Sequence, residues 1–135
     1  MRQKLYHFLI YGFAGWMIEI IFTGTGSILR GDPTLVAWTY LWMFPIYGMA
    51  VFLEPVHDRI RSVPWWIRGI VWTGFIFILE YFSGLTLRTL TGLCPWDYGH
   101  RLFSMDGLIR LDYAPFWFFA GLGFERLHDL MERLF

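Results

Sequence analysis

Long apolar runs alternate with short polar segments along this chain. Four of the runs are close to the ~20 residues that a membrane-spanning helix needs, and they predict helices over about 5–23, 35–53, 65–87 and 108–127. No connection between them is long enough to hold a soluble domain. The pattern predicts an all-α polytopic membrane protein, with a single four-helix transmembrane domain over residues 1–135 built from two α-hairpins.

Composition agrees with a bilayer environment. The 135 residues are 56% hydrophobic and only 16% charged, whereas soluble domains usually have about 25% charged residues. The formal net charge is zero, so no basic surface indicates nucleic acid as a partner. The only cysteine, Cys94, excludes an internal disulfide and a zinc site built on several cysteines. Glu19 interrupts the first apolar run and no small-residue cleavage site follows, so we interpret this run as a retained helix.

Basic residues predict the orientation, because cytoplasmic flanks of membrane spans carry an excess of them. Seven flank one side of the predicted spans: Arg2, Lys4, Arg59, Arg61, Arg68, Arg126 and Arg133. Four flank the other side: Arg30, Arg88, Arg101 and Arg110. We therefore expect both termini in the cytoplasm, in a plasma membrane or a bacterial inner membrane.

Two carboxylates interrupt the apolar runs of the first and third predicted helices, Glu19 and Glu80. A charge in hydrocarbon costs at least ~2.5 kcal/mol on insertion scales, so intramembrane ionisable residues are functional candidates by default. At a rise of 1.5 Å per residue, both lie about two thirds of the way toward the outer face. We expect them to face each other in a polar cavity and to share a proton or hold a cation. The alternative is a pair of hydrogen-bonding groups that only fixes helix register.

The two halves of the chain repeat a weak polar pattern. Glu19 and Glu80 are each followed by a glycine and an arginine, and the next predicted helix ends in Glu-x-x-His-Asp, at Glu54 and at Glu125. Both halves would start in the cytoplasm, which makes this a parallel repeat; coincidence among few polar residues is the alternative. Two Glu-x-x-His pairs also occur in di-iron bundles, but here they lie about 20 Å from Glu19 along the helix. We therefore expect no metal and interpret the pairs as solvated charges that cap helix ends.

A loop over about 89–107 joins the third and fourth predicted helices. Its residues 92–99 (GLCPWDYG) contain the glycine and proline of turns, and its aromatic residues are too apolar for a free loop. We expect it to fold back as a lid or re-entrant segment on the outer face.

The glutamates, the lid and the adjoining helix ends supply the candidate ligand-binding residues, which are Glu19, Glu80, Arg88, Trp96, Asp97, Tyr98 and Asp112. Each has a structural alternative. Arg88 can extend to lipid headgroups, Asp97 can cap backbone N–H groups in a turn, and Asp112 can pair with Arg88 or Arg110.

Several motifs together carry a family resemblance: residues 15–19 (GWMIE), 46–48 (IYG), 79–81 (LEY) with Gly84 and Arg88, 94–98 (CPWDY), 107–109 (GLI), Asp112 with Tyr113, and Trp117. With them the chain resembles the transmembrane protein 229 family and the related bacterial CmpB-type family of ABC-transporter permeases. The resemblance covers nearly the whole chain and implies a four-helix membrane protein. The chain has no P-loop, so any ATPase would be a separate protein.

Three classes of function fit these features. The first is a small permease-like transporter or binding protein, whose acidic pocket in the outer half of the membrane takes a cation or a cationic headgroup. The second is a membrane enzyme acting on a lipid or polyprenyl substrate, with Glu19 or Glu80 as base and Arg88 as anion clamp. The third is an accessory subunit whose polar core sets fold and assembly. We expect a non-enzymatic role without a cofactor, membrane lipid as a partner, and a homodimer or a partner membrane subunit.

Overall fold

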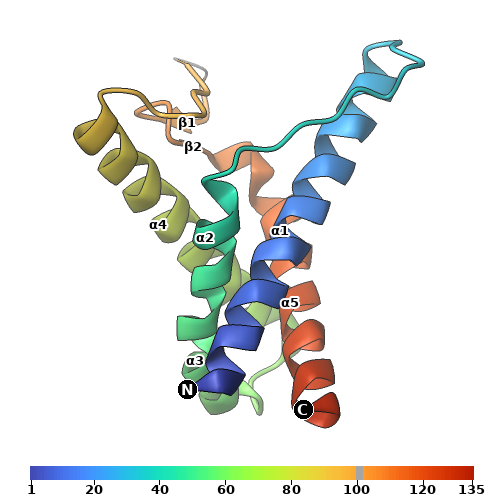
Figure 1. Cartoon of the computed structure of the whole chain (residues 1–135), viewed down its shortest axis with the longest axis vertical. Helices are drawn as coiled ribbons and strands as arrows, with labels where there is room; N and C mark the ends of the chain where they lie inside the picture. The colour runs from blue at the N-terminus through green and yellow to red at the C-terminus, as the bar shows by residue number, and fades with distance from the viewer. Residues whose placement is uncertain (100–101) are drawn as a thin grey trace. The chain divides into compact units, whose positions relative to one another are not determined.

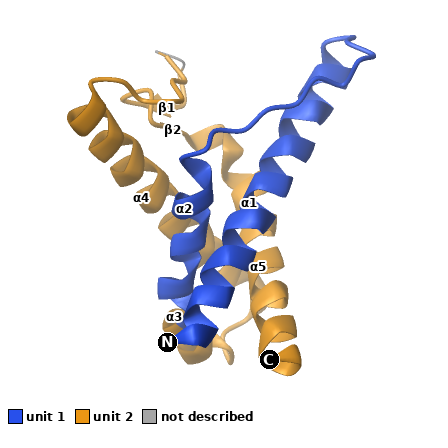
Figure 2. Cartoon of the chain, in the orientation of Figure 1, with its two compact units in different colours: residues 1–54 blue, residues 55–135 orange. Residues whose placement is uncertain are grey.

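The computed structural model describes residues 1–99 and 102–135 and is mostly helical (Figure 1). Its elements are α1 (Arg2–Leu29), α2 (Met43–Gly48), the 3-10 helix η1 (Met49–Leu53), α3 (Glu54–Ile60), α4 (Trp65–Thr91), the strands β1 (Ser104–Met105) and β2 (Ile109–Arg110), the 3-10 helix η2 (Leu111–Tyr113) and α5 (Ala114–Leu134). The chain divides into two compact units, Met1–Glu54 and Pro55–Phe135 (Figure 2). The single four-helix domain stays a prediction, and Arg101, used in the orientation argument, lies outside the described residues.

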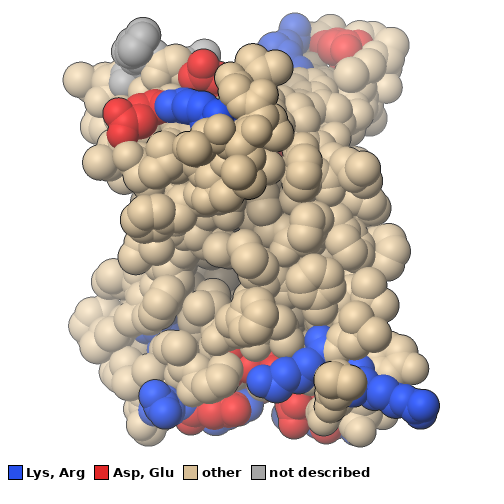
Figure 3. Space-filling model, turned by 60° about the vertical axis from the view of Figure 1, so that its left-hand side comes forward, with Lys and Arg blue, Asp and Glu red and all other residues tan. Residues whose placement is uncertain are grey.

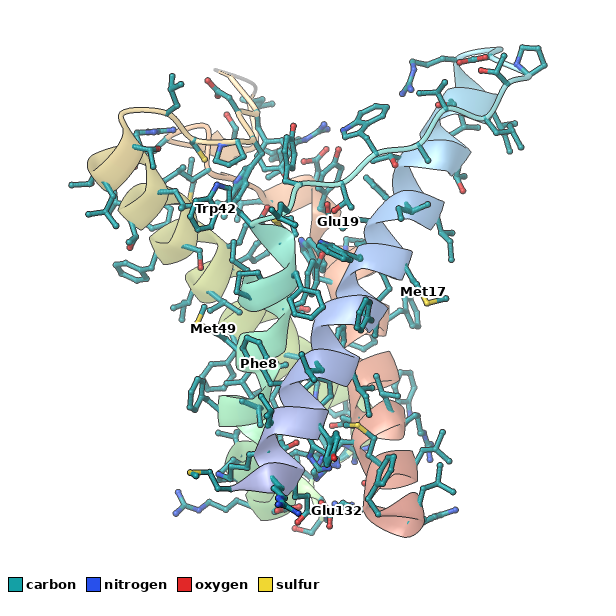
Figure 4. The ribbon with its side chains drawn as sticks, viewed as in Figure 1. Phe8, Met17, Glu19, Trp42, Met49 and Glu132 are labelled. Carbon is teal, nitrogen blue, oxygen red and sulfur yellow. The ribbon has the colours of Figure 1, made fainter. Side chains whose placement is uncertain are left out.

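Two helices are long and apolar enough to cross a bilayer, α1 with 28 residues and α4 with 27. Both expose large apolar side chains. Met17 of α1 is 62% exposed and points away from α2 (Figure 4), and Phe82 of α4 is 58% exposed. On the face drawn in Figure 3, charged residues gather near helix ends and other residues form the surface between them. These are the surfaces expected of helices in contact with lipid.

Glycines allow α1 and α2 to pack closely in unit 1. A Cβ atom at Gly15 would lie 2.0 Å from Cγ of Tyr47, and one at Gly48 would lie 2.6 Å from Cε2 of Phe8. Phe8 accordingly lies on the side of α1 that faces α2 (Figure 4). Small residues at a helix interface let backbones approach in this way.

The second predicted helix, 35–53, is wrong at both ends, because residues 35–42 are not helical and helical turns continue to Ile60. Side chains of α1 instead bind alternate carbonyl groups of the non-helical segment: Ser27 donates to Val36, Thr23 to Trp38 and Trp16 to Tyr40. These hydrogen bonds satisfy backbone groups that a helix would otherwise have satisfied internally. An apolar segment can therefore run extended along α1.

The fourth helix begins at Ala114 rather than at the predicted Leu108. Leu108 and Ile109 are buried, with 0% and 5% exposure, but Ile109 belongs to strand β2, which pairs antiparallel with β1. Pro115 lies in the first turn of α5, a position where proline's missing N–H has no cost. Hydropathy alone therefore placed the helix start too early.

The segment between α4 and α5 folds back onto its own unit, as the lid prediction expects. α4 ends at Gly92, whose φ of +76° is left-handed, the usual conformation for a glycine that terminates a helix. A Cβ atom at Gly84 of α4 would lie 2.8 Å from Cδ2 of Leu108 and 3.0 Å from the Trp96 ring. The lid thus rests on Gly84, which leaves room for these two side chains.

Candidate functional site

Glu19 is held by two hydroxyl groups of unit 1. Its Oε1 accepts a hydrogen bond from the Tyr47 hydroxyl at 2.9 Å, and its Oε2 accepts one from the Thr39 hydroxyl at 3.3 Å. Thr39 belongs to the extended segment and Tyr47 to α2, the side toward which Glu19 points (Figure 4). The carboxylate is half-buried. Because a carboxylate can accept about four hydrogen bonds, these two donors leave acceptor capacity for a ligand.

Glu80 is buried in unit 2, with 8% exposure. Its Oε1 accepts a hydrogen bond from the Tyr98 hydroxyl at 2.8 Å. Tyr98 is a lid residue, and its own N–H donates to the Gly107 carbonyl at 2.9 Å. Glu19 and Glu80 therefore each receive a tyrosine hydroxyl from the part of their own unit that follows the long helix.

Two further contacts fasten the lid to α4. Arg88 donates from Nη2 to the Asp106 carbonyl oxygen at 2.9 Å, and the Tyr81 hydroxyl donates to Oδ2 of Asp106 at 2.5 Å. Within the lid, buried Trp96 donates from Nε1 to the Leu108 carbonyl at 3.0 Å. Arg88 and Trp96 thus position the lid over the end of α4.

The remaining candidates make local contacts. Oδ1 of Asp97 accepts the Gly99 N–H at 2.7 Å, which is the turn-capping role weighed as its alternative. Of the two partners considered for Asp112, the structure pairs it with Arg110 at 2.5 Å. The Arg110 guanidinium also lies 4.4 Å from the centre of the Tyr113 ring.

Six of the seven candidates belong to unit 2, and Glu19 belongs to unit 1. The structure joins Glu80 directly to Tyr98, and it brings Asp97 and Arg88 together around Gly107, where an added Cβ atom would lie 2.4 Å from Oδ1 of Asp97 and 3.7 Å from Nη2 of Arg88. A cavity shared by Glu19 and Glu80 stays a prediction.

Cys94 lies on the same part of the lid. Burial raises the pKa of its thiol, and the nearby Arg88 guanidinium opposes this shift only in part. The thiol is therefore protonated at neutral pH and is not an activated nucleophile. It packs beside Gly84, with Sγ 3.4 Å from the position of an added Cβ atom.

A second carboxylate in each unit is bound by two donors one helical turn apart. In unit 1, Oε1 of Glu54 lies 2.6 Å from Nδ1 of His7 and accepts the Tyr11 hydroxyl at 3.0 Å. In unit 2, Oε1 of Glu125 accepts Nε–H of Arg68 at 2.9 Å and Nε1–H of Trp72 at 2.6 Å. Glu125 is 7% exposed. The interpretation of Glu54 and Glu125 as solvated caps was therefore wrong; both are acceptors in largely buried networks.

These contacts support the internal repeat and keep the register that pairs Glu19 with Glu80. The spacing from His7 to Tyr11 to Glu19 is also the spacing from Arg68 to Trp72 to Glu80. The glycine and the arginine that follow each glutamate do not match in this way, because their distances from the glutamate differ between the two halves. Each unit thus contains one carboxylate, Glu54 or Glu125, that is bound by donors near the start of the long helix; we call it the inner carboxylate. Farther along the same helix lies a second glutamate, Glu19 or Glu80, that is bound by a tyrosine.

Sequence analysis missed His7, Tyr11, Arg68 and Trp72 as partners. The sequence did contain a pattern that predicts them. Hydrogen-bonding side chains four positions apart face the same side of a helix, and such a pair occurs at matching places in both halves. His57 extends the unit 2 network, because its Nδ1 lies 3.4 Å from Oε1 of Glu125 and its Nε2 lies 3.1 Å from Oδ1 of Asp129.

Comparison with known proteins concerns nearly the entire chain. No solved structure matches it. The profile of the family described as "Putative ABC-transporter type IV" matches residues 6–134, a range that includes Glu19, Glu80, the lid and both inner carboxylates. Together with the two long apolar helices, this match indicates a membrane protein of transporter type. The chain belongs to this CmpB-type family, as its motifs around Glu19, Glu80 and Asp97 predicted.

Proposed function

We propose that this protein is a permease-like component of a transport system that binds a cation, or the cationic headgroup of a lipid, at Glu19 and Glu80. In this proposal four helices span the membrane as two hairpins, both termini are cytoplasmic, and the two glutamates lie in its outer half. The family supports the transport class. Coupling to ATP would require a separate ATPase subunit.

The observation that carries the proposal is the pair of tyrosine contacts. Tyr47 binds Glu19 and Tyr98 binds Glu80, at 2.9 and 2.8 Å. A binding group is effective when neighbouring groups hold it in one orientation, and these hydroxyls do this for both carboxylates. The same type of partner, a tyrosine hydroxyl, occurs at both glutamates. This recurrence is not expected if the carboxylates have no role in their apolar helices.

An accessory subunit is the second candidate, and the same hydrogen bonds favour it. If Tyr47, Thr39 and Tyr98 satisfy the carboxylates completely, the glutamates serve only to fix the packing of each unit. The two candidates differ in one property, which is whether a soluble cation stabilises the folded protein.

Tetramethylammonium chloride is expected to stabilise the wild-type protein, and the variants Glu19→Gln and Glu80→Gln are expected to lose this effect. The measurement is thermal unfolding in a neutral detergent, with NaCl as the replacement salt at constant ionic strength. A ligand at a hundred times its dissociation constant stabilises by about 2.7 kcal/mol. Glutamine keeps the shape of the side chain and a carbonyl acceptor, so both variants should fold.

Asp58→Asn is the matched control, because Asp58 is a carboxylate with 58% side-chain exposure. It should respond to tetramethylammonium like the wild type. Stabilisation that persists in both glutamine variants would refute the proposal. No stabilisation of the wild type beyond NaCl would refute it too, and would leave the accessory subunit.

A further inference from the structure

The two glutamates of the proposed site differ in exposure. Glu19 is half-buried, whereas Glu80 is 8% exposed and its Oε1 accepts the hydroxyl of the lid residue Tyr98 at 2.8 Å. A cation that binds Glu80 must therefore reach a carboxylate that is covered in this conformation. Part of the protein has to move whenever a cation enters or leaves, and the lid is a segment that lies on the carboxylate.

The lid has a buried base, made of Trp96, Leu108 and Ile109. Their exposed fractions are 7%, 0% and 5%, and Nε1 of Trp96 donates to the Leu108 carbonyl at 3.0 Å. Trp96 and Leu108 also pack on α4 at Gly84, where an added Cβ atom would lie 3.0 Å from the first and 2.8 Å from the second. Lifting the base would expose large apolar side chains to water, which is unfavourable. We therefore expect the base to stay in place.

The tip of the lid, which we define as residues 97–99 and 105–107, is less buried than the base. The Tyr98 N–H donates to the Gly107 carbonyl at 2.9 Å, so the two parts of the tip are joined to each other. Most residues of the tip are exposed. Segments with exposed backbone and few buried contacts open at a lower free energy than the core. The tip can therefore lift as one piece and carry Tyr98 away from Glu80.

Asp106 fastens the tip to α4. Its Oδ2 accepts the Tyr81 hydroxyl at 2.5 Å, and its carbonyl oxygen accepts a hydrogen bond from Nη2 of Arg88 at 2.9 Å. Tyr81 directly follows Glu80 in the sequence, so the first of these bonds holds the tip close to the carboxylate that Tyr98 covers. Both bonds are exposed, and bonds to water can replace them when the tip lifts.

We propose that the tip of the lid is a gate over Glu80 and that Asp106 is its latch. A cation enters and leaves when Asp106 separates from Tyr81 and Arg88 and the tip takes Tyr98 off the carboxylate. This proposal rests on the proposed function and assigns the regulation of one of its two glutamates. Tyr81 and Asp106 are positioning residues, which act on Glu80 through the lid. Glu19 receives its hydroxyl donors from unit 1, so we expect it to be independent of the latch.

The test compares how fast a water-soluble carbodiimide modifies Glu80 and Glu19 in the same protein molecules. With glycine ethyl ester as the amine, the reagent converts an accessible carboxyl group to an amide, and mass spectrometry of peptides reports each glutamate separately. Tyr81→Phe removes only the latch hydroxyl. It should raise the rate at Glu80 about 3- to 10-fold, the shift in open population when one hydrogen bond is lost, because modification follows that population. The rate at Glu19 should not change.

Thr89→Val is the matched control, because the Thr89 hydroxyl donates to the Leu85 carbonyl of α4 itself; it should behave like the wild type. Asp106→Ala is the second latch variant and should act like Tyr81→Phe. An unchanged rate at Glu80 in both latch variants, or an equal increase at Glu19, would overturn the inference.

The same reaction also tests the proposed function separately. Tetramethylammonium chloride should slow the modification of Glu19 and Glu80 in the wild type, relative to NaCl at the same ionic strength. Protection of both glutamates, combined with latch variants that react like the wild type, would overturn the gate and leave the proposed function standing. If tetramethylammonium protects neither glutamate, the proposed function fails and the inference fails with it.

Discussion

Glu125→Ala is expected to lower the free energy of unfolding by about 3–5 kcal/mol, the usual effect of removing one partner from a buried ion pair. Glu125 is 7% exposed and accepts hydrogen bonds from Arg68 and Trp72. The change leaves the Arg68 guanidinium, whose side chain is only 18% exposed, without its carboxylate. Arginine cannot shed its proton to escape this cost. Unfolding by sodium dodecyl sulfate, followed by tryptophan fluorescence, gives the free energy.

Two comparison variants separate the ion pair from general damage. Asp58→Ala removes an exposed carboxylate of the same unit and should cost no more than about 1 kcal/mol. Replacing both partners, Arg68→Met with Glu125→Leu, should be far less destabilising than Glu125→Ala alone, because no buried charge then remains unpaired. If the double variant is as unstable as Glu125→Ala, the loss comes from packing and the ion-pair account is wrong.

Gly121→Ala is expected to destabilise the protein by about 1–3 kcal/mol, as overpacking of an interior does. An added Cβ atom at Gly121 of α5 would lie 2.3 Å from the Trp72 Cβ. A Cβ atom is fixed by its own backbone, so Trp72 cannot rotate away and α4 and α5 must separate. The same displacement would strain the bond between Trp72 and Glu125, at 2.6 Å.

Gly123→Ala supplies the control on the same helix. No described heavy atom lies within 4 Å of its added Cβ position, so alanine should be neutral or stabilise by up to about 1 kcal/mol through its higher helix propensity. Both variants are compared in the same detergent-unfolding measurement. Equal effects at the two positions would contradict close packing of α5 on α4 through Gly121.

The long helices were predictable and the starts of the returning helices were not. The apolar runs that predicted 5–23 and 65–87 are contained in α1 and α4, Arg2–Leu29 and Trp65–Thr91. The returning segments begin with apolar residues in non-helical conformations, 35–42 and Leu108–Ile109. Hydropathy measures burial or lipid contact and not backbone conformation. The hydrogen bonds that decide the conformation come from α1 side chains and from a strand partner, both of which are tertiary contacts.

The carboxylates of the site were also predictable, because a charge within an apolar run is costly and therefore conspicuous. Their partners were not, since Tyr47 and Tyr98 are two of several aromatic residues that sequence alone does not distinguish. For the inner carboxylates, the environment predicted from the sequence was wrong. Glu54 and Glu125 occur near charged residues and were interpreted as solvated, although their donors stand one turn apart at matching places in α1 and α4.

The central claim is that the carboxylates of Glu19 and Glu80 themselves bind a cation, and infrared difference spectroscopy tests it most directly. The reconstituted protein is perfused alternately with NaCl and tetramethylammonium chloride, and the change in carboxylate absorption is recorded for the wild type, Glu19→Gln and Glu80→Gln. We predict a reversible carboxylate signal in the wild type that is lost in each glutamine variant, because neither variant binds the cation. A difference spectrum that is the same in all three proteins would contradict the claim, because the responding carboxylates would then lie elsewhere.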